Sequence, residues 1–149
     1  MLARSLKLRF FETHEEDHFN QTDEAFAKAG ELSPYDVDVR QEWARFLLEA
    51  GRLQQDVGKL RLCIEKCQQG YLLDVKHAEL CAIWAEALAA LGEYSDQIDL
   101  LYEAQNKITE ALHLEEDNLE VLHAEAQVCY SWGVYYEDFD YYFQAIEKF

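Results

Sequence analysis

Apolar residues recur along this chain at intervals of three and four, which is the period of a helix with one buried face. Leu53, Val57, Leu60 and Ile64, for example, follow one another at spacings of four, three and four. With one proline and six glycines, turn-forming residues are few, so long helices are favoured over a sheet with many turns. The pattern predicts about seven helices, near residues 3–14, 19–31, 37–50, 53–69, 75–91, 94–114 and 118–136, with an eighth begun near residue 139.

Two blocks of similar sequence indicate an internal repeat. The first runs from Trp43 to Gly51 and the second from Trp84 to Gly92, so the tryptophans and the glycines are separated by the same interval. Trp132 follows the second block at a longer interval, and we expect the three tryptophans to be buried at equivalent places. Many helices end at a residue with a left-handed backbone conformation, which glycine adopts readily. We therefore expect Gly51 and Gly92 to be helix C-caps.

A second helical stripe follows each block, which indicates a series of antiparallel helical hairpins. Asp74 and either Asp117 or Asn118 are the predicted N-caps of the helices that open the next hairpins. One hairpin cannot bury its apolar face alone, whereas stacked hairpins share a continuous core. We therefore predict an all-α fold, an α-solenoid of antiparallel helical hairpins that forms one repeat domain over residues 1–149. The chain stops at Phe149 inside an apolar helical pattern, so we expect the array to continue past its C-terminal end.

Acidic residues dominate the second half of the chain. The net charge is -17, and residues 77–149 carry only Lys107 and Lys148 as basic residues. Nucleic-acid binders need a cationic surface, so this class is excluded, whereas a basic protein partner would be attracted. The chain has no apolar run long enough for a membrane span. Its four cysteines fall inside helical patterns without metal-ligand spacing, which favours reduced thiols and a cytoplasmic location.

The hairpin pattern resembles the tetratricopeptide repeat (TPR) family, whose motif is two antiparallel helices in about 34 residues. Residues 126–149 carry the best match, and residues 17–34 match the second helix of the motif with its closing proline. The longer spacing here implies elongated hairpins. The family's glycine, two tyrosine, alanine and phenylalanine places are held by Gly133, Tyr136, Tyr142, Ala145 and Phe149.

In TPR proteins the first helix of each hairpin lines a concave inner face that commonly binds peptides or extended segments. By this register, the resemblance places twelve side chains on the inner face: Arg4, Lys7, Phe11, Asp38, Gln41, Arg45, Glu79, Ala82, Glu86, Gln127, Tyr130 and Val134. The peptide-binding residues we predict among them are Gln41, Arg45, Glu79, Glu86, Gln127 and Tyr130. Glu79 and Glu86 favour a basic or neutral partner segment over the chaperone carboxylates that one subfamily clamps.

Two metal-binding patterns occur in the sequence, and neither predicts a site. Residues 14–18 match HExxH, but charged residues fill the two middle positions, and the motif falls at a predicted turn instead of mid-helix. Glu-x-x-His occurs three times, in a chain with 30 acidic residues, where chance occurrences are expected. We therefore expect no catalytic residues, no metal and no cofactor.

Aromatic residues are dense near the C-terminus, with Tyr141 and Phe143 among them. They cannot all be buried in one terminal hairpin, so this end is a candidate surface for self-association or for a partner. The function that the sequence favours is a scaffold or adaptor that binds a peptide or protein segment on its concave face. A dedicated chaperone for secreted cargo, built on the same repeats, is the alternative, and a metal-dependent enzyme is a remote one.

Overall fold

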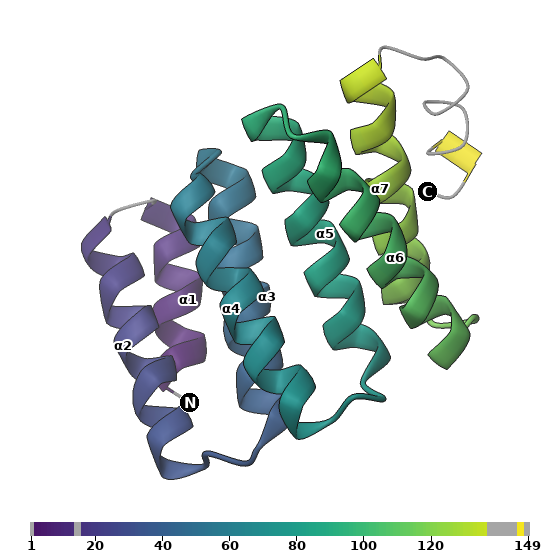
Figure 1. The fold of residues 1–149 in the computed structure, drawn as a ribbon. Helices are drawn as coiled ribbons and strands as arrows, with labels where there is room; N and C mark the ends of the chain where they lie inside the picture. The colour runs from purple at the N-terminus through teal and green to yellow at the C-terminus, as the bar shows by residue number, and fades with distance from the viewer. Residues whose placement is uncertain (1, 14–15, 137–145, 148–149) are drawn as a thin grey trace.

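The computed structural model describes residues 2–13, 16–136 and 146–147, and seven helices run through the described part (Figure 1). No strand occurs among these residues. Successive helices pack as antiparallel pairs that stack side by side, which confirms the all-α solenoid of hairpins. The helices are α1 (Leu2–Thr13), α2 (Glu16–Leu32), α3 (Val37–Gln54), α4 (Val57–Leu73), α5 (Ala78–Ser95), α6 (Ile98–Leu114) and α7 (Leu119–Tyr136). The predicted eighth helix lies mostly outside the described residues.

The repeat keeps one constant period from α2 to the end of α7. Helices α2, α4 and α6 end at Leu32, Leu73 and Leu114, which are equally spaced along the chain. Helices α3, α5 and α7 start with the same spacing. One period after Trp84 stands Glu125, so the predicted equivalence of Trp132 is wrong. Trp132 lies seven residues farther along α7, two helical turns on, so it keeps a similar face and is buried.

The two repeat glycines lie inside helices, so the prediction that they are C-caps is wrong. The left-handed residues are Gln55 and Asp96, with φ of 50° and 54°. A Cβ on Gly51 would lie 2.9 Å from the side chain of Leu60, and one on Gly92 would lie 3.0 Å from the Gln97 carbonyl oxygen. These glycines therefore allow the second helix to pack closely. Helices α4 and α6, which follow these glycines, begin about four residues later than the apolar pattern suggested.

Of the two predicted helix N-caps, one is confirmed and the other is wrong. Asn118 Oδ1 accepts a hydrogen bond from the backbone N–H of Glu120 at 2.9 Å, so Asn118 caps α7 as predicted. Asp74 does not cap α5, because its carboxylate accepts from the N–H of Lys76 inside the turn. The N-cap of α5 is His77, whose Nδ1 accepts from the N–H of Leu80 at 3.3 Å. A neutral imidazole has this acceptor, although sequence rules favour other residue types.

Aromatic rings fill the core of the first two hairpins. The fully buried Phe46 of α3 has its ring centroid 5.7 Å from Phe10 of α1 and 5.2 Å from Phe19 of α2. Trp43 is also buried, stacks on Phe26 and donates from Nε1 to Asp23 at 2.8 Å. This ring cluster fixes α1 and α2 against α3.

Around α5 the core is built mainly of small residues. Eight of the residues of α5 are buried alanine, glycine or cysteine, and α5 packs against α3, α4, α6 and α7. Trp84 is only half-buried, contrary to prediction, and lies against Tyr71 of α4 and Lys107 of α6. The four cysteines are buried, and none of them is in a disulfide within the described part of the chain. No helix in the described part of the chain is long and apolar enough to cross a bilayer.

Candidate binding face

The inner face is the surface formed by the polar side chains of α3, α5 and α7. Repeat-equivalent positions line up across it. Arg45, Glu86 and Gln127 hold the same repeat position on the three helices, and Asp38, Glu79 and Glu120 hold another. The prediction placed most of these residues on one face by helical phase, and the structure brings five of the six predicted site residues into one polar network: Gln41, Arg45, Glu79, Glu86 and Gln127.

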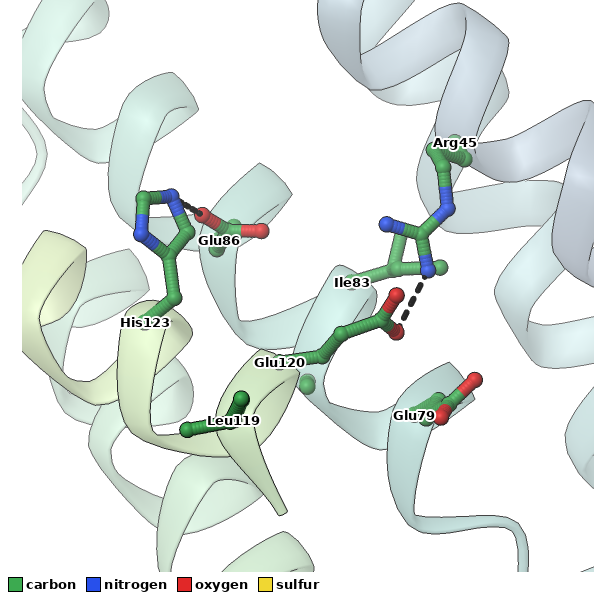
Figure 2. Close-up of a pocket in the computed structure, with 8 residues that line it drawn as sticks. Arg45, Glu79, Ile83, Glu86, Leu119, Glu120 and His123 are labelled. Carbon is green, nitrogen blue, oxygen red and sulfur yellow. Dashed lines mark hydrogen bonds and ion pairs between the residues drawn. The ribbon is translucent and has the colours of Figure 1, made fainter.

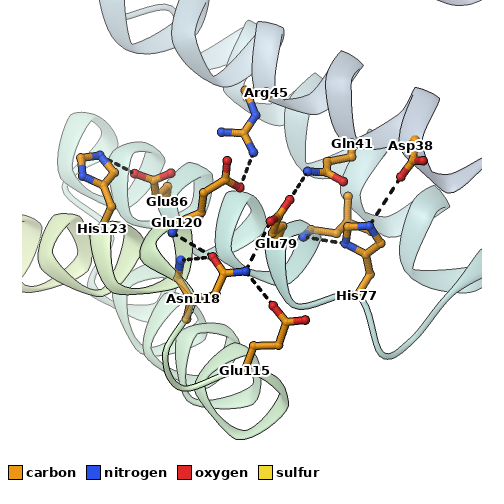
Figure 3. A network of polar contacts seen from close by, with 12 residues as sticks. Asp38, Gln41, Arg45, His77, Glu79, Glu86, Glu115, Asn118, Glu120 and His123 are labelled. Atoms are coloured by element: carbon orange, nitrogen blue, oxygen red, sulfur yellow. Dashed lines mark hydrogen bonds and ion pairs between the residues drawn. The ribbon is translucent and has the colours of Figure 1, made fainter.

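Side chains of α3 reach those of α7 across α5. Arg45 Nη2 donates to Glu120 Oε2 at 2.7 Å (Figure 3), and Arg52 Nη2 donates to Gln127 Oε1 at 2.6 Å. Each pair joins residues 75 positions apart. Between them α5 presents the short side chain of Ala82, so long side chains from both sides can meet. The face is therefore hollowed along α5.

A pocket of about 170 Å³ occupies this hollow (Figure 2). Its apolar walls are Ala82, Ile83 and Leu119, and Leu119 is 81% exposed at the rim. Its charged and polar groups come from all three helices: Arg45, Glu79, Glu86, Glu120 and His123. The pocket thus combines an aliphatic wall with an excess of carboxylates.

Glu86 is the most deeply placed of the pocket carboxylates, with a side chain only 10% exposed. Its Oε1 lies 3.4 Å from Arg52 Nη1 and 3.7 Å from His123 Nε2. Burial raises the pKa of Glu86 to about 7, although Arg52 and Arg45 lower it. These contacts are too long to offset the loss of hydration, so the carboxyl takes up a proton near neutral pH.

Glu79 behaves in the opposite way. Burial raises its pKa, but hydrogen bonds to the charged form outweigh this effect and bring the pKa below the ordinary value. Gln41 Nε2 donates to Oε2 of Glu79 at 2.7 Å, and Asn118 Nδ2 donates to Oε1 at 3.3 Å (Figure 3). Glu79 therefore stays ionised at the edge of the pocket.

The remaining predicted residue, Tyr130, is 43% exposed on α7 and does not line the pocket. Helical phase missed Arg52, Glu120 and His123, which take part in the network. The repeat contains the signal for two of them. Glu120 stands one repeat after Glu79, and Arg52 stands one repeat after Phe11, a residue already assigned to the inner face. The longer interval between Trp84 and Trp132 concealed this register.

Cations of the N-terminal helices continue the inner face towards α1. Arg4 lies 3.8 Å from Glu42, and Lys7 lies 3.5 Å from Glu49. Together with Arg45 these cations line a second hollow of about 300 Å³. Between α1 and α3 the charges of the inner face are therefore paired, whereas near α5 and α7 carboxylates are in excess.

The metal-binding patterns of the sequence do not form a cluster in the described residues. No group of three or more His, Cys, Asp or Glu side chains among them is arranged to hold a metal ion. Of the HExxH pattern, His14 and Glu15 lie outside the described part. Glu110, from another pattern, accepts a hydrogen bond from Tyr71 Oη at 2.8 Å and pairs with Lys107 at 3.3 Å.

No protein-family model matches this chain, and no curated protein is detectably similar to it. The resemblance to TPR proteins thus rests on the sequence motifs alone and stays a prediction. Tyr141 and Phe143, the predicted self-association surface, lie outside the described residues.

Proposed function

We propose that this chain is a protein-interaction module, not an enzyme, and that it holds a segment of another protein on the inner face. The observation that carries this proposal is the pocket between α3, α5 and α7. It opens on a face where charged and apolar groups from three helices converge. Ligand sites commonly combine a concave, partly apolar wall with a few convergent polar groups.

The charge of the inner face favours a partner segment that is basic where it lies over α5 and α7. Glu79, Glu86 and Glu120 lie there, in the half of the chain that carries most of the net negative charge. Long-range attraction would speed the encounter with such a segment, and rising salt would slow it.

The charge pairs that cross the inner face can be exchanged for contacts with a partner. Arg45 and Glu120 have side chains 31% and 44% exposed, and pairs of such exposure contribute only about 0–1 kcal/mol to stability. An incoming segment that offers its own charges would therefore lose little by displacing them.

Site-specific photo-crosslinking tests the location of binding. A photo-reactive residue replaces Gln127 on the inner face of α7 or Asn106 on the exposed face of α6, and each variant is expressed in its native cells. We expect protein adducts from position 127 that are absent from position 106. Adducts from position 106 alone, or equal adducts from both positions, would contradict binding on the inner face.

A second measurement tests the chemistry of the partner once adducts identify it. Glu79→Gln combined with Glu120→Gln should lower the association rate and flatten its dependence on salt, because two negative charges of the inner face are removed. Glu103→Gln with Glu116→Gln removes the same charge from exposed positions elsewhere and serves as the control. Equal effects of the two double variants would exclude specific charge recognition by the inner face.

A further inference from the structure

We propose that the pocket between α3, α5 and α7 receives a single lysine side chain of the bound segment. This inference rests on the proposed function and specifies which chemical group enters the face. The ammonium group would lie among the carboxylates of Glu79, Glu86 and Glu120. Its methylene stem would lie against Ala82, Ile83 and Leu119.

The depth of Glu86 in the pocket points to a cationic ligand. The side chain of Glu86 is nine-tenths buried, and both of its ion-pair contacts, to Arg52 and His123, are made by Oε1. The second oxygen of this carboxylate, Oε2, is not a buried atom without a partner. Figure 2 shows this second oxygen on the side of the carboxylate that faces away from His123. A carboxylate that has lost most of its hydration is costly to keep charged, and a cationic ligand that donates to it would offset this cost.

The arrangement of the carboxylates favours an ammonium group over a guanidinium group. Glu79 and Glu86 project from α5 and Glu120 projects from α7, so acceptors surround the pocket from different directions. An ammonium group has three donors that can satisfy separate acceptors, whereas a guanidinium group is a planar fork suited to one carboxylate. Arg45 already occupies the position beside Glu120, at 2.7 Å.

The pocket also suits the stem of lysine by size and lining. A volume of about 170 Å³ is enough for the short alkyl chain of lysine. Lysine side chains characteristically bury their methylene groups against apolar surface and keep the charged end hydrated or paired. The aliphatic wall and the carboxylates therefore match the two parts of one lysine side chain.

Nuclear magnetic resonance titration of the full chain tests this pocket directly. The probes are the Nα-acetyl N-methylamides of lysine, arginine and norleucine at millimolar concentration. We expect saturable shifts from lysine at the amides of Ile83, Glu86 and His123, weaker shifts from arginine, and none from norleucine. Glu86→Gln should weaken the binding of the lysine probe roughly tenfold, because one charged hydrogen-bond acceptor is lost.

Two further variants separate pocket binding from general attraction by an acidic protein. Ala82→Leu leaves the charge unchanged and fills the pocket, so it should abolish the lysine shifts, whereas Glu103→Gln on α6 should leave them intact. Lysine shifts that are absent, matched by arginine or unaffected by Ala82→Leu would overturn the lysine pocket. Cross-links from position 127 would then still support the binding face, whereas pocket shifts with cross-links only from position 106 would overturn the proposed function instead.

Discussion

Phe46 and Ala87 occupy the same place in successive repeats, and both are fully buried. On α3 this position holds a ring whose centroid lies 5.2–6.0 Å from those of four neighbouring phenylalanines. On α5 it holds a methyl group. The comparison shows that one helical repeat can be filled in two ways. Rings fix the first hairpins, while small side chains bring α5 close to its neighbours and leave room for the pocket.

The largest effect should follow from removal of the ring at the first of these positions. Phe46→Ala deletes the centre of the aromatic cluster, and a cavity there should cost about 3–5 kcal/mol of unfolding free energy. Chemical denaturation monitored by circular dichroism measures the loss.

The converse exchange tests the other half of the comparison. Ala87→Phe inserts a ring where α5 has no space, and overpacking should cost about 1–3 kcal/mol. If Ala87→Phe left stability unchanged, the region around α5 would be loosely packed, and small residues would not explain the pocket.

The two tryptophans at equivalent repeat positions should also contribute differently to stability, with the larger contribution from the one in the aromatic cluster. Trp43 is buried, stacks on Phe26 and donates to Asp23, so Trp43→Ala should cost about 3–5 kcal/mol. Trp84 is half-buried beneath Lys107, so Trp84→Ala should cost less, about 2–3 kcal/mol. Thermal unfolding of both variants at one pH gives the order. A larger loss of stability in Trp84→Ala would mean that the hairpin of α5 and α6, not the aromatic cluster, limits the stability of the fold.

The helical periodicity was sufficient to predict the fold, but the repeat register was harder to find. Apolar spacing reveals each helix, because burial demands one apolar face. Gly51 and Gly92 misled the placement of helix ends, since glycine serves close packing as well as left-handed caps. Trp132 misled the register, because a shift of two turns keeps a residue on the same face. The equivalence of the repeats appears only when Leu32, Leu73 and Leu114 are compared at helix ends.

The inner face was predicted in outline and its energetics were not. Helical phase alone placed Glu79 and Glu86 on the same surface and gave no reason for their pKa values to differ. Their difference depends on partners from other hairpins, namely two close amide donors for Glu79 and longer contacts for Glu86. Such partners come from helices 34 to 39 residues away in sequence, and only the stacked hairpins bring them together.

A pH-dependent effect should follow at Glu86, the deepest residue of the pocket. Its pKa is about 7 in the folded chain and lower when unfolded, so the folded state binds the extra proton between these values. Its contribution to stability is therefore lost as pH rises towards 7. Glu86→Gln mimics the protonated form and should be more stable than the parent by roughly 2–3 kcal/mol at pH 8.

Below pH 4 the two proteins should be equally stable, because Glu86 is then protonated in both states. Denaturation of the variant and the parent at several pH values isolates this residue, since every other titrating group is common to both. A constant difference across pH would show that Glu86 is not desolvated by burial, and the pocket would then be open to solvent.

The smallest effect should come from the pair that crosses the hollow beside α5. Arg45→Gln removes the contact with Glu120, and the partial exposure of both side chains limits the loss to about 0.2–1 kcal/mol. It should also raise the pKa of Glu86 further, because Arg45 lowers that pKa in the parent chain. Carboxyl chemical shifts during a pH titration report this change, and Arg61→Gln on the exposed face of α4 is the matched control.

The size of the stability loss in Arg45→Gln decides how the inner face works. A small loss means that a partner can open the contact between α3 and α7 at little cost, as the proposed function requires. A loss above about 2 kcal/mol would mean that the crossing pair holds the hairpins together, and a bound segment could not displace it.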